Sequence, residues 1–354
     1  MSDRPTVRDD LRALQGYHSP QVEVRVRLNT NEAPGPPPAE WVERYRAELG
    51  SIAFHRYPDR SAHRLREAIA SLHSVNAANV FVANGSNEVL QTILLTYAGA
   101  GRTVTTFEPT YQLHGHIARV SGARHLEGER AADFSLDLDV VGELLRDERP
   151  NVTFLCSPNN PTGIVDTPDA VRRTLDEPSG LLVVDEAYAQ FAPWSALELI
   201  DDERPLVVTR TFSKTWSMAG ARLGYCVGPT WLIAELHKVV LPYHLDAAKQ
   251  LAGVLALEFV GEMEARVEAI VDERERVAIA LADLPVDTWP SGANFILFRP
   301  RHTDGGATWQ ALVDRGVLVR NCASWPRLGG CLRVTIGTHE ENNAFLGALT
   351  EVLL

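Results

Sequence analysis

The sequence predicts an α/β fold built around a mainly parallel β-sheet, and three observations lead to this prediction. Short runs rich in β-branched residues alternate with helix-like segments through the middle of the chain. These runs are almost continuously apolar, which indicates strands buried on both faces, as in parallel sheets. Glycine, proline and asparagine punctuate the connections between them. The predicted strands are 80–84, 102–109, 123–128, 151–158, 181–188, 206–213 and 222–228.

The pattern changes after about residue 255. From Met263 onward, apolar residues recur at three- and four-residue steps, which predicts one long amphipathic helix. Three further strand-like runs follow at 293–300, 316–321 and 331–337. We therefore expect a large α/β domain over 46–255 and a smaller α+β domain formed by 1–45 plus 256–354.

Composition excludes several classes of protein. The 354 residues are 45% hydrophobic and 23% charged, as in ordinary globular proteins, and the net charge of −12 argues against nucleic-acid or anionic-membrane partners. No apolar run approaches the ~20 residues that span a bilayer, and residues 1–20 lack a signal peptide's apolar stretch. We expect a cytoplasmic protein. The four cysteines and the pair His114 and His116 lack convincing metal spacing, so no metal is predicted.

Lys214 is the first candidate for chemistry. It follows the apolar run Leu-Val-Val, and most lone lysines are solvated surface charges. Its neighbours change this interpretation, because Thr211 and Ser213 supply hydroxyls and Arg222 supplies a cation. Hydroxyls and an arginine around a lysine suit a phosphorylated carbonyl compound.

Further polar residues stand at other predicted strand ends. Asp185 ends one strand, and a carboxylate there either caps a turn or pairs with a protonated ring nitrogen. Asn160 lies in the turn 157–163. Gly85, Ser86 and Asn87 open a predicted helix, and their backbone N–H groups would suit a phosphate. Because ligands bind beyond the carboxyl ends of such strands, these residues predict one site.

In their order along the chain, six motifs resemble the fold-type I aminotransferases that depend on pyridoxal 5′-phosphate (PLP). They are NGSNE, PTY, SPNNPTG, VVDEAY, SKTWSMAGARLGY and CLRVTIG, within a likeness that covers nearly the whole chain. The resemblance implies the PLP-dependent transferase fold of aspartate aminotransferase, with PLP as cofactor.

The resemblance also implies a role for each matching residue. Lys214 would carry PLP and shuttle a proton, Asp185 would pair with its ring nitrogen, and Asn160 and Tyr188 would bond its ring oxygen. Tyr111 would stack on the ring. The phosphate would be bound at Gly85, Ser86, Asn87, Thr211, Ser213 and Arg222, and by Tyr57 of the neighbouring subunit. A homodimer with shared active sites follows from this last role.

Within that family the chain most resembles the histidinol-phosphate aminotransferases. The likeness lies in 8–21, 27–34 and 316–342, and it matches Tyr17, Arg320 and Arg333 to the residues that bind the substrate phosphate. It implies transamination of histidinol phosphate with 2-oxoglutarate or glutamate, in histidine biosynthesis. Ala33 and Asp246 depart from the usual pattern, Asp246 near where the substrate would enter, and Trp325 adds bulk beside the anion-binding strand. An aminotransferase for aromatic or other amino acids, or a decarboxylase, shares most cofactor motifs and stays open.

Two other classes are disfavoured by the residues present. A regulatory protein without turnover would be marked by loss of Lys214 or Asp185, and both are present. A nicotinamide-dependent dehydrogenase is disfavoured because no GxGxxG motif follows the first strand of the α/β unit.

Overall fold

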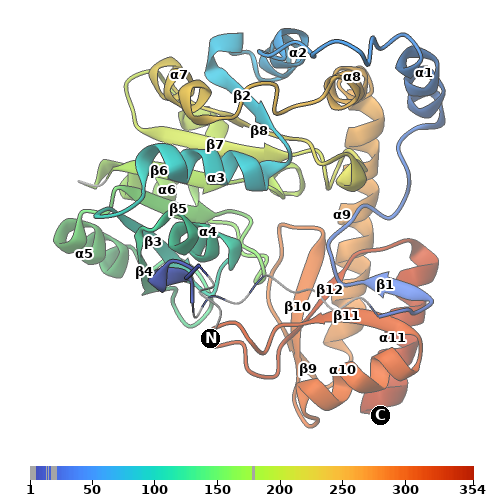
Figure 1. The fold of residues 1–354 in the computed structure, drawn as a ribbon. Helices are drawn as coiled ribbons and strands as arrows, with labels where there is room; N and C mark the ends of the chain where they lie inside the picture. Colours follow the sequence, from blue (N-terminus) through green and yellow to red (C-terminus); the bar gives the residue numbers. More distant parts are fainter. Residues whose placement is uncertain (1–4, 13, 15, 17–21, 178–179) are drawn as a thin grey trace.

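Two β-sheets organise the protein in a computed structural model that describes residues 5–12, 14, 16, 22–177 and 180–354. Figure 1 shows the seven-stranded sheet in the upper half, the five-stranded sheet below it, and the long helix α9 (Val260–Ala282) beside both. In the described part of the chain, no helix has the length and apolar character needed to cross a membrane.

The larger sheet has the strand order β2-β8-β7-β6-β5-β3-β4. The strands β3 to β7 run parallel, and only β8 pairs antiparallel with its neighbours β7 and β2. The predicted mainly parallel sheet is therefore confirmed, and each of its seven strands overlaps a predicted run, with only β4 reaching one residue beyond it. Their bounds are β2 (Val80–Ala83), β3 (Thr103–Glu108), β4 (Arg124–Glu129), β5 (Val152–Cys156), β6 (Leu181–Asp185), β7 (Leu206–Thr211) and β8 (Gly224–Val227).

Helices cover both faces of this sheet, because successive side chains of a strand point to opposite sides. Leu181 and Val183 of β6 pack on the side of α3 (Ser86–Tyr97), α4 (Leu113–Ser121) and α7 (Thr230–Val239). Leu182 and Val184 pack on the other side, against α5 (Leu138–Glu148) and α6 (Pro168–Asp176). A further core under β2 and β8 includes residues of α1 (Ala39–Leu49), α2 (His63–His73) and α8 (Ala247–Ala256).

The smaller sheet has the order β1-β11-β12-β10-β9 and draws on both ends of the chain. Its strands are β1 (Val26–Leu28), β9 (Val286–Thr288), β10 (Phe295–Pro300), β11 (Val317–Asn321) and β12 (Leu332–Thr335). It shares a core with α9, α10 (Gly305–Asp314) and α11 (His339–Leu353). The strands β1 and β9 were not predicted, because three residues are too few for a recognisable pattern. The domain boundaries at 45/46 and 255/256 stay a prediction.

A buried ion pair fixes the loop that follows β5. The carboxylate of Asp166 accepts bonds of 2.7 and 3.0 Å from the guanidinium of Arg130, and both side chains are at most 1% exposed. The backbone N–H of Asp166 donates to Ser157 Oγ at 2.9 Å. Arg130 and Asp166 therefore hold the segment that carries Asn160.

We predict that Asp166→Ala lowers the free energy of unfolding by about 3–5 kcal/mol, because it leaves the Arg130 guanidinium buried without its partner. Urea unfolding followed by circular dichroism measures the change. Asp169→Ala, at an exposed position in the first turn of α6, is the control and should shift the midpoint little. An equal midpoint for both variants would contradict this role of the pair.

Candidate active site

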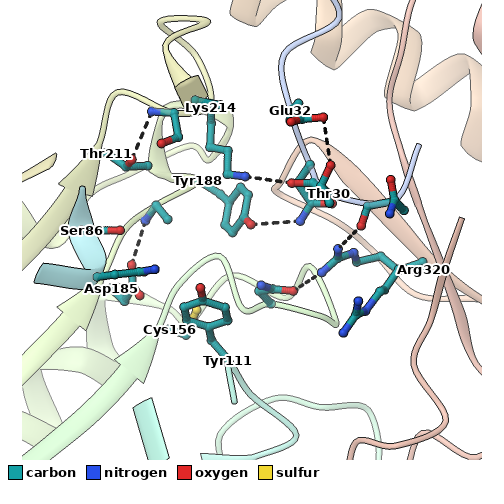
Figure 2. A pocket seen from close by; sticks show the side chains of 18 of the residues that line it. Thr30, Glu32, Ser86, Tyr111, Cys156, Asp185, Tyr188, Thr211, Lys214 and Arg320 are labelled. Atoms are coloured by element: carbon teal, nitrogen blue, oxygen red, sulfur yellow. Dashed lines mark hydrogen bonds between the residues drawn. The ribbon is translucent and has the colours of Figure 1, made fainter. Parts of the chain in front are cut away.

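The main candidate site is a pocket of about 360 Å³ at the carboxyl ends of β5, β6 and β7, facing the smaller sheet. The structure brings twelve of the predicted residues together there: Ser86, Asn87, Tyr111, Asn160, Asp185, Tyr188, Thr211, Ser213, Lys214, Arg222, Arg320 and Arg333. Figure 2 shows Ser86 and Asp185 on one side of the pocket, Arg320 on the opposite side, and Lys214 between them.

Lys214 follows β7 and reaches into the pocket. Its Nζ donates a hydrogen bond of 3.0 Å to the backbone oxygen of Thr30, and it lies 5.7 Å from the centre of the Tyr188 ring. Burial, together with the cations Arg333 and Arg222, lowers the pKa of Lys214 to about 7, while Glu32 acts in the opposite direction. Near neutral pH this amine is therefore both a proton acceptor and a nucleophile.

Asp185 ends β6 and is held by two donors. Its Oδ1 accepts the backbone N–H of Ala187 at 3.1 Å, and its Oδ2 lies 2.9 Å from Nε2 of His114 in α4. His114 is fully buried and stacks on Phe154, with ring centres 4.5 Å apart. From its spacing to His116, His114 had been weighed only as a metal ligand. Its position three residues after Tyr111, at the start of a helix, is a signal that could have placed it in the site.

One end of the pocket gathers donors that would suit an anion. Ser86 and Asn87 form the first turn of α3, after Gly85 with φ +82°. Arg222 donates from Nη1 to Ser213 Oγ at 3.2 Å, and a side chain at position 85 would meet its guanidinium at 2.8 Å. Backbone N–H groups at a helix start, a hydroxyl and a guanidinium are the donors that a phosphate requires.

The opposite end carries two arginines on neighbouring strands. Arg320 of β11 and Arg333 of β12 are direct cross-strand partners. Arg333 is 5% exposed, bonds the side-chain oxygen of Asn160 and the backbone oxygen of Asn29, and keeps a buried Nε without a hydrogen-bond partner in the described structure. Like charges placed directly opposite on a sheet are destabilising unless an anion joins them.

The wall of the pocket beside Lys214 comes from the N-terminal segment. Tyr188 is buried, its hydroxyl accepts a bond of 2.9 Å from Asn31 Nδ2, and burial raises its pKa to about 12. Thr30 and Glu32 also line this wall. The sequence analysis assigned no role to these three N-terminal residues, because their place depends on a pairing of β1 with the distant strand β11.

Gly85, which directly precedes Ser86, and Tyr57 are the two predicted residues within the described part of the chain that do not line this pocket. Tyr57 is 80% exposed and stacks on Tyr243, with ring centres 4.5 Å apart. Tyr17 lies outside the described residues.

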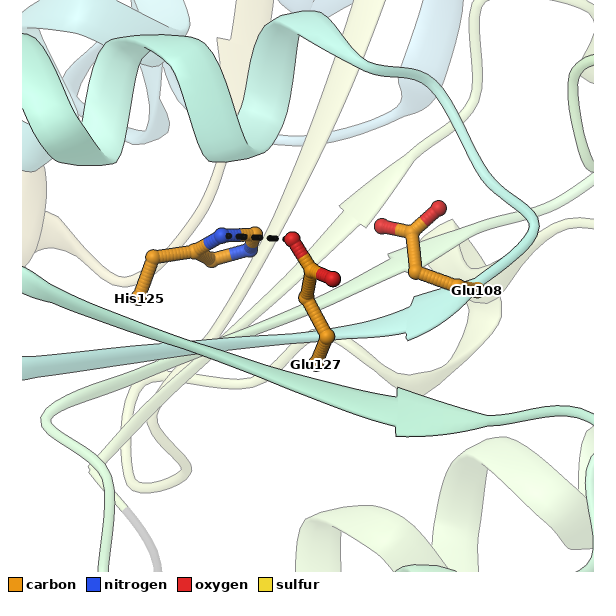
Figure 3. Close-up of side chains that lie close together, drawn as sticks. All are labelled: Glu108, His125 and Glu127. Carbon is orange, nitrogen blue, oxygen red and sulfur yellow. Dashed lines mark ion pairs between the residues drawn. The ribbon is translucent and has the colours of Figure 1, made fainter. Parts of the chain in front are cut away.

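A second cluster, outside this pocket, has donor atoms suited to a metal. Oxygen or nitrogen atoms of Glu108, His125 and Glu127 lie within 4.8 Å of one another (Figure 3). The guanidinium of Arg119 already lies 3.0 Å from His125 Nδ1 and 2.8 Å from Glu127 Oε1. Thr106 Oγ links His125 Nε2 to Glu108 Oε1 at 2.9 and 3.0 Å. The chain's own donors and one cation satisfy this cluster, so we assign it no metal.

The pocket has the groups that PLP needs. The turn at Ser86 and Asn87, with Ser213 and Arg222, would hold the phosphate, and the Asp185 carboxylate would hold the pyridine nitrogen. Glycine at position 85 keeps this space open for the phosphate, because a side chain there would meet the Arg222 guanidinium. Lys214 supplies the amine that would bind the aldehyde. When bound, PLP supplies a ring that withdraws electrons from the substrate.

We predict that the protein stripped of PLP binds it about tenfold faster at pH 8 than at pH 6, because Lys214 loses its proton near pH 7 and the neutral amine is the reactive form. Stopped-flow absorbance measures the rate. Above pH 8 the rate should level off. A rate that keeps rising tenfold per pH unit beyond pH 9 would indicate an ordinary lysine and contradict the lowered pKa.

Comparison with known proteins shows the family to which the chain belongs. Histidinol-phosphate aminotransferase of Corynebacterium glutamicum is 40% identical, across 100% of this chain and 98% of its own length. The Mycolicibacterium smegmatis enzyme of the same name is 42% identical, across 99% and 94%. The structure of histidinol-phosphate aminotransferase from Sinorhizobium meliloti in complex with pyridoxal-5′-phosphate superposes with a TM-score of 0.83 at 26% identity, covering 94% of this chain and 91% of that one. Residues 23–349 match the family of class I and II aminotransferases, which use PLP. The chain belongs to this family.

Proposed function

We propose that this protein transfers an amino group between histidinol phosphate and 2-oxoglutarate, with glutamate as the other product, in histidine biosynthesis. The observation that carries the proposal is the pair Arg320 and Arg333, which face each other across two strands in the pocket that contains Lys214. Identities of 40–43% over the full chain with enzymes of this name support the same substrate.

The two arginines favour a dianion over a carboxylate. A phosphate monoester carries up to two charges and three oxygens, which suits two guanidinium groups at once. Each charge-assisted hydrogen bond contributes about 1.5–3 kcal/mol. An amine without the phosphate leaves the buried Nε of Arg333 without a partner, and such an unpaired group penalises the wrong substrate.

The residues at the centre of the pocket would perform the proton transfer. Lys214 Nζ would accept the proton from the substrate's α-carbon and return it, which requires a pKa near the working pH. Asp185, fixed by His114 and by the N–H of Ala187, would keep a negative charge at the cofactor ring. Tyr188 keeps its phenolic proton at neutral pH, since its pKa is about 12, and would donate a hydrogen bond.

We propose further that the protein is a homodimer with shared active sites. Three large apolar side chains are mostly exposed: Tyr57 at 80%, Leu241 at 76% and Phe54 at 75%. Such exposure is unusual in a monomer and typical of an interface. Tyr57 does not line the pocket of its own subunit, so its expected contact with the cofactor phosphate would be made in the partner subunit.

The four cysteines are buried free thiols, which suits the reducing cytoplasm.

A half-reaction tests the substrate. Histidinol phosphate added to the PLP-loaded protein without a keto acid should convert the cofactor to its amine form, followed by absorbance. Histidinol should be weaker by about 100-fold or more, because it lacks at least two charge-assisted bonds. Lys214→Ala should show no conversion. If phenylalanine reacts as well as histidinol phosphate, the protein is an aromatic aminotransferase and the proposal is wrong.

Mixing two variants tests the shared site. Lys214→Ala and Tyr57→Ala should each impair transamination, assayed at limiting PLP. Subunits exchanged between them should regain activity, because a mixed dimer has one site with an intact Lys214 and an intact Tyr57 from the other subunit. If Tyr57 served its own subunit, every site in the mixed dimer would keep one defect. Activity unchanged by mixing would therefore reject the shared arrangement.

A further inference from the structure

The loop between β11 and β12 carries a tryptophan into the pocket. Trp325 is 5% exposed, and the loop around it is closed by backbone bonds from Cys322 N to Cys331 O at 3.0 Å and from Leu328 N to Trp325 O at 3.2 Å. Trp325 shares a buried cluster with Phe134. The indole is therefore held in one place before any ligand arrives.

The indole contacts both walls of the pocket. Its Nε1 donates a bond of 2.9 Å to the backbone oxygen of Thr110, the residue before Tyr111 in the larger domain. Its ring faces Arg320, whose guanidinium carbon lies 5.2 Å from the ring centre. This distance is within the range of a cation–π interaction.

We propose that Trp325 is a positioning residue that orients Arg320 for the substrate phosphate and so sets the preference for a phosphorylated amine. This inference rests on the proposed function.

The two arginines need different means of orientation. Arg333 is fixed by Asn160 and Asn29. Arg320 stands directly opposite this fixed charge, and repulsion between them favours rotamers that turn Arg320 away. Contact with the Trp325 ring offsets part of that repulsion and helps to hold the Arg320 guanidinium toward the pocket.

The effect should fall mainly on the phosphorylated substrate. A phosphate dianion concentrates two charges on one group and can engage both arginines, whereas each carboxylate of glutamate carries one charge, which Arg333 alone can match. Losing the orientation of Arg320 would therefore weaken histidinol phosphate more than glutamate. A structural defect in the pocket would weaken both equally.

The test compares Trp325→Ala, Trp325→Phe and the matched control Trp289→Phe. Trp289 packs against the same buried cluster and also faces an arginine, Arg299, at 5.7 Å, but it does not line the pocket. Trp325→Ala should raise KM for histidinol phosphate about 2- to 30-fold, the range expected for a lost cation–π contact, with little change in kcat or in KM for glutamate. Trp325→Phe keeps a ring face and should recover part of the loss. Trp289→Phe should behave as wild type.

A double-mutant cycle separates action through Arg320 from direct contact with the substrate. Trp325→Ala should add almost nothing to the KM increase of Arg320→Ala, because the residue acts through that guanidinium. Additive effects, or equal increases for glutamate, would overturn the proposal. Thermal unfolding checks that each variant folds, and Trp325→Phe carries the test if the alanine variant does not.

Inhibition of the glutamate half-reaction by inorganic phosphate tests the role of Trp325 independently of the proposed substrate. If wild type fails to convert histidinol phosphate, the proposed function is wrong, and phosphate inhibition still decides the role of Trp325. The inhibition constant should rise with Trp325→Ala and stay unchanged with Trp289→Phe. Absence of phosphate inhibition in wild type, or equal inhibition in all variants, would overturn the role.

Discussion

The concentration of positive charge inside one pocket is the constraint on which the site depends. A chain with a net charge of −12 places Arg222, Arg320, Arg333 and Lys214 around a single cavity. Two of these arginines lower the pKa of Lys214, so the groups that attract anions also keep the amine reactive. An anion bound beside them would offset their effect on the lysine. Ligand binding and the proton affinity of Lys214 are therefore coupled.

The two anion receptors come from different parts of the fold. One uses the start of α3 and a hydroxyl after β7, both fixed by the larger sheet. The other uses neighbouring strands of the smaller sheet. A ligand with negative charge at both ends, or a cofactor and substrate with one anionic group each, would join the two. The space between them is where Lys214 lies.

Sequence patterns were sufficient for most of the fold and for the centre of the site. The apolar runs located all seven strands of the larger sheet, and the residues after them gave Lys214, Asp185 and Asn160, because parallel strands bring their carboxyl ends to one edge. The helix predicted from Met263 is α9, which begins at Val260.

The parts that were missed depend on contacts distant in the sequence. His114 meets Asp185 across 71 positions, and Asn31 meets Tyr188 across 157. In neither pair does the sequence around one residue indicate which residue it contacts. The three-residue strand β1 is defined only by its pairing with β11, and so is the place of Thr30 beside Lys214.

The helix α9 has a consequence for how the molecule holds together. Met263 near its start lies in the core under the larger sheet, while Ile270, Val277 and Leu281 lie in the core of the smaller one. Val267, between them, packs against both cores. One continuous helix thus contributes side chains to both hydrophobic cores. Unfolding of one core would expose part of the helix surface that the other core buries. We therefore expect the two halves of the molecule to unfold together, although each has its own sheet.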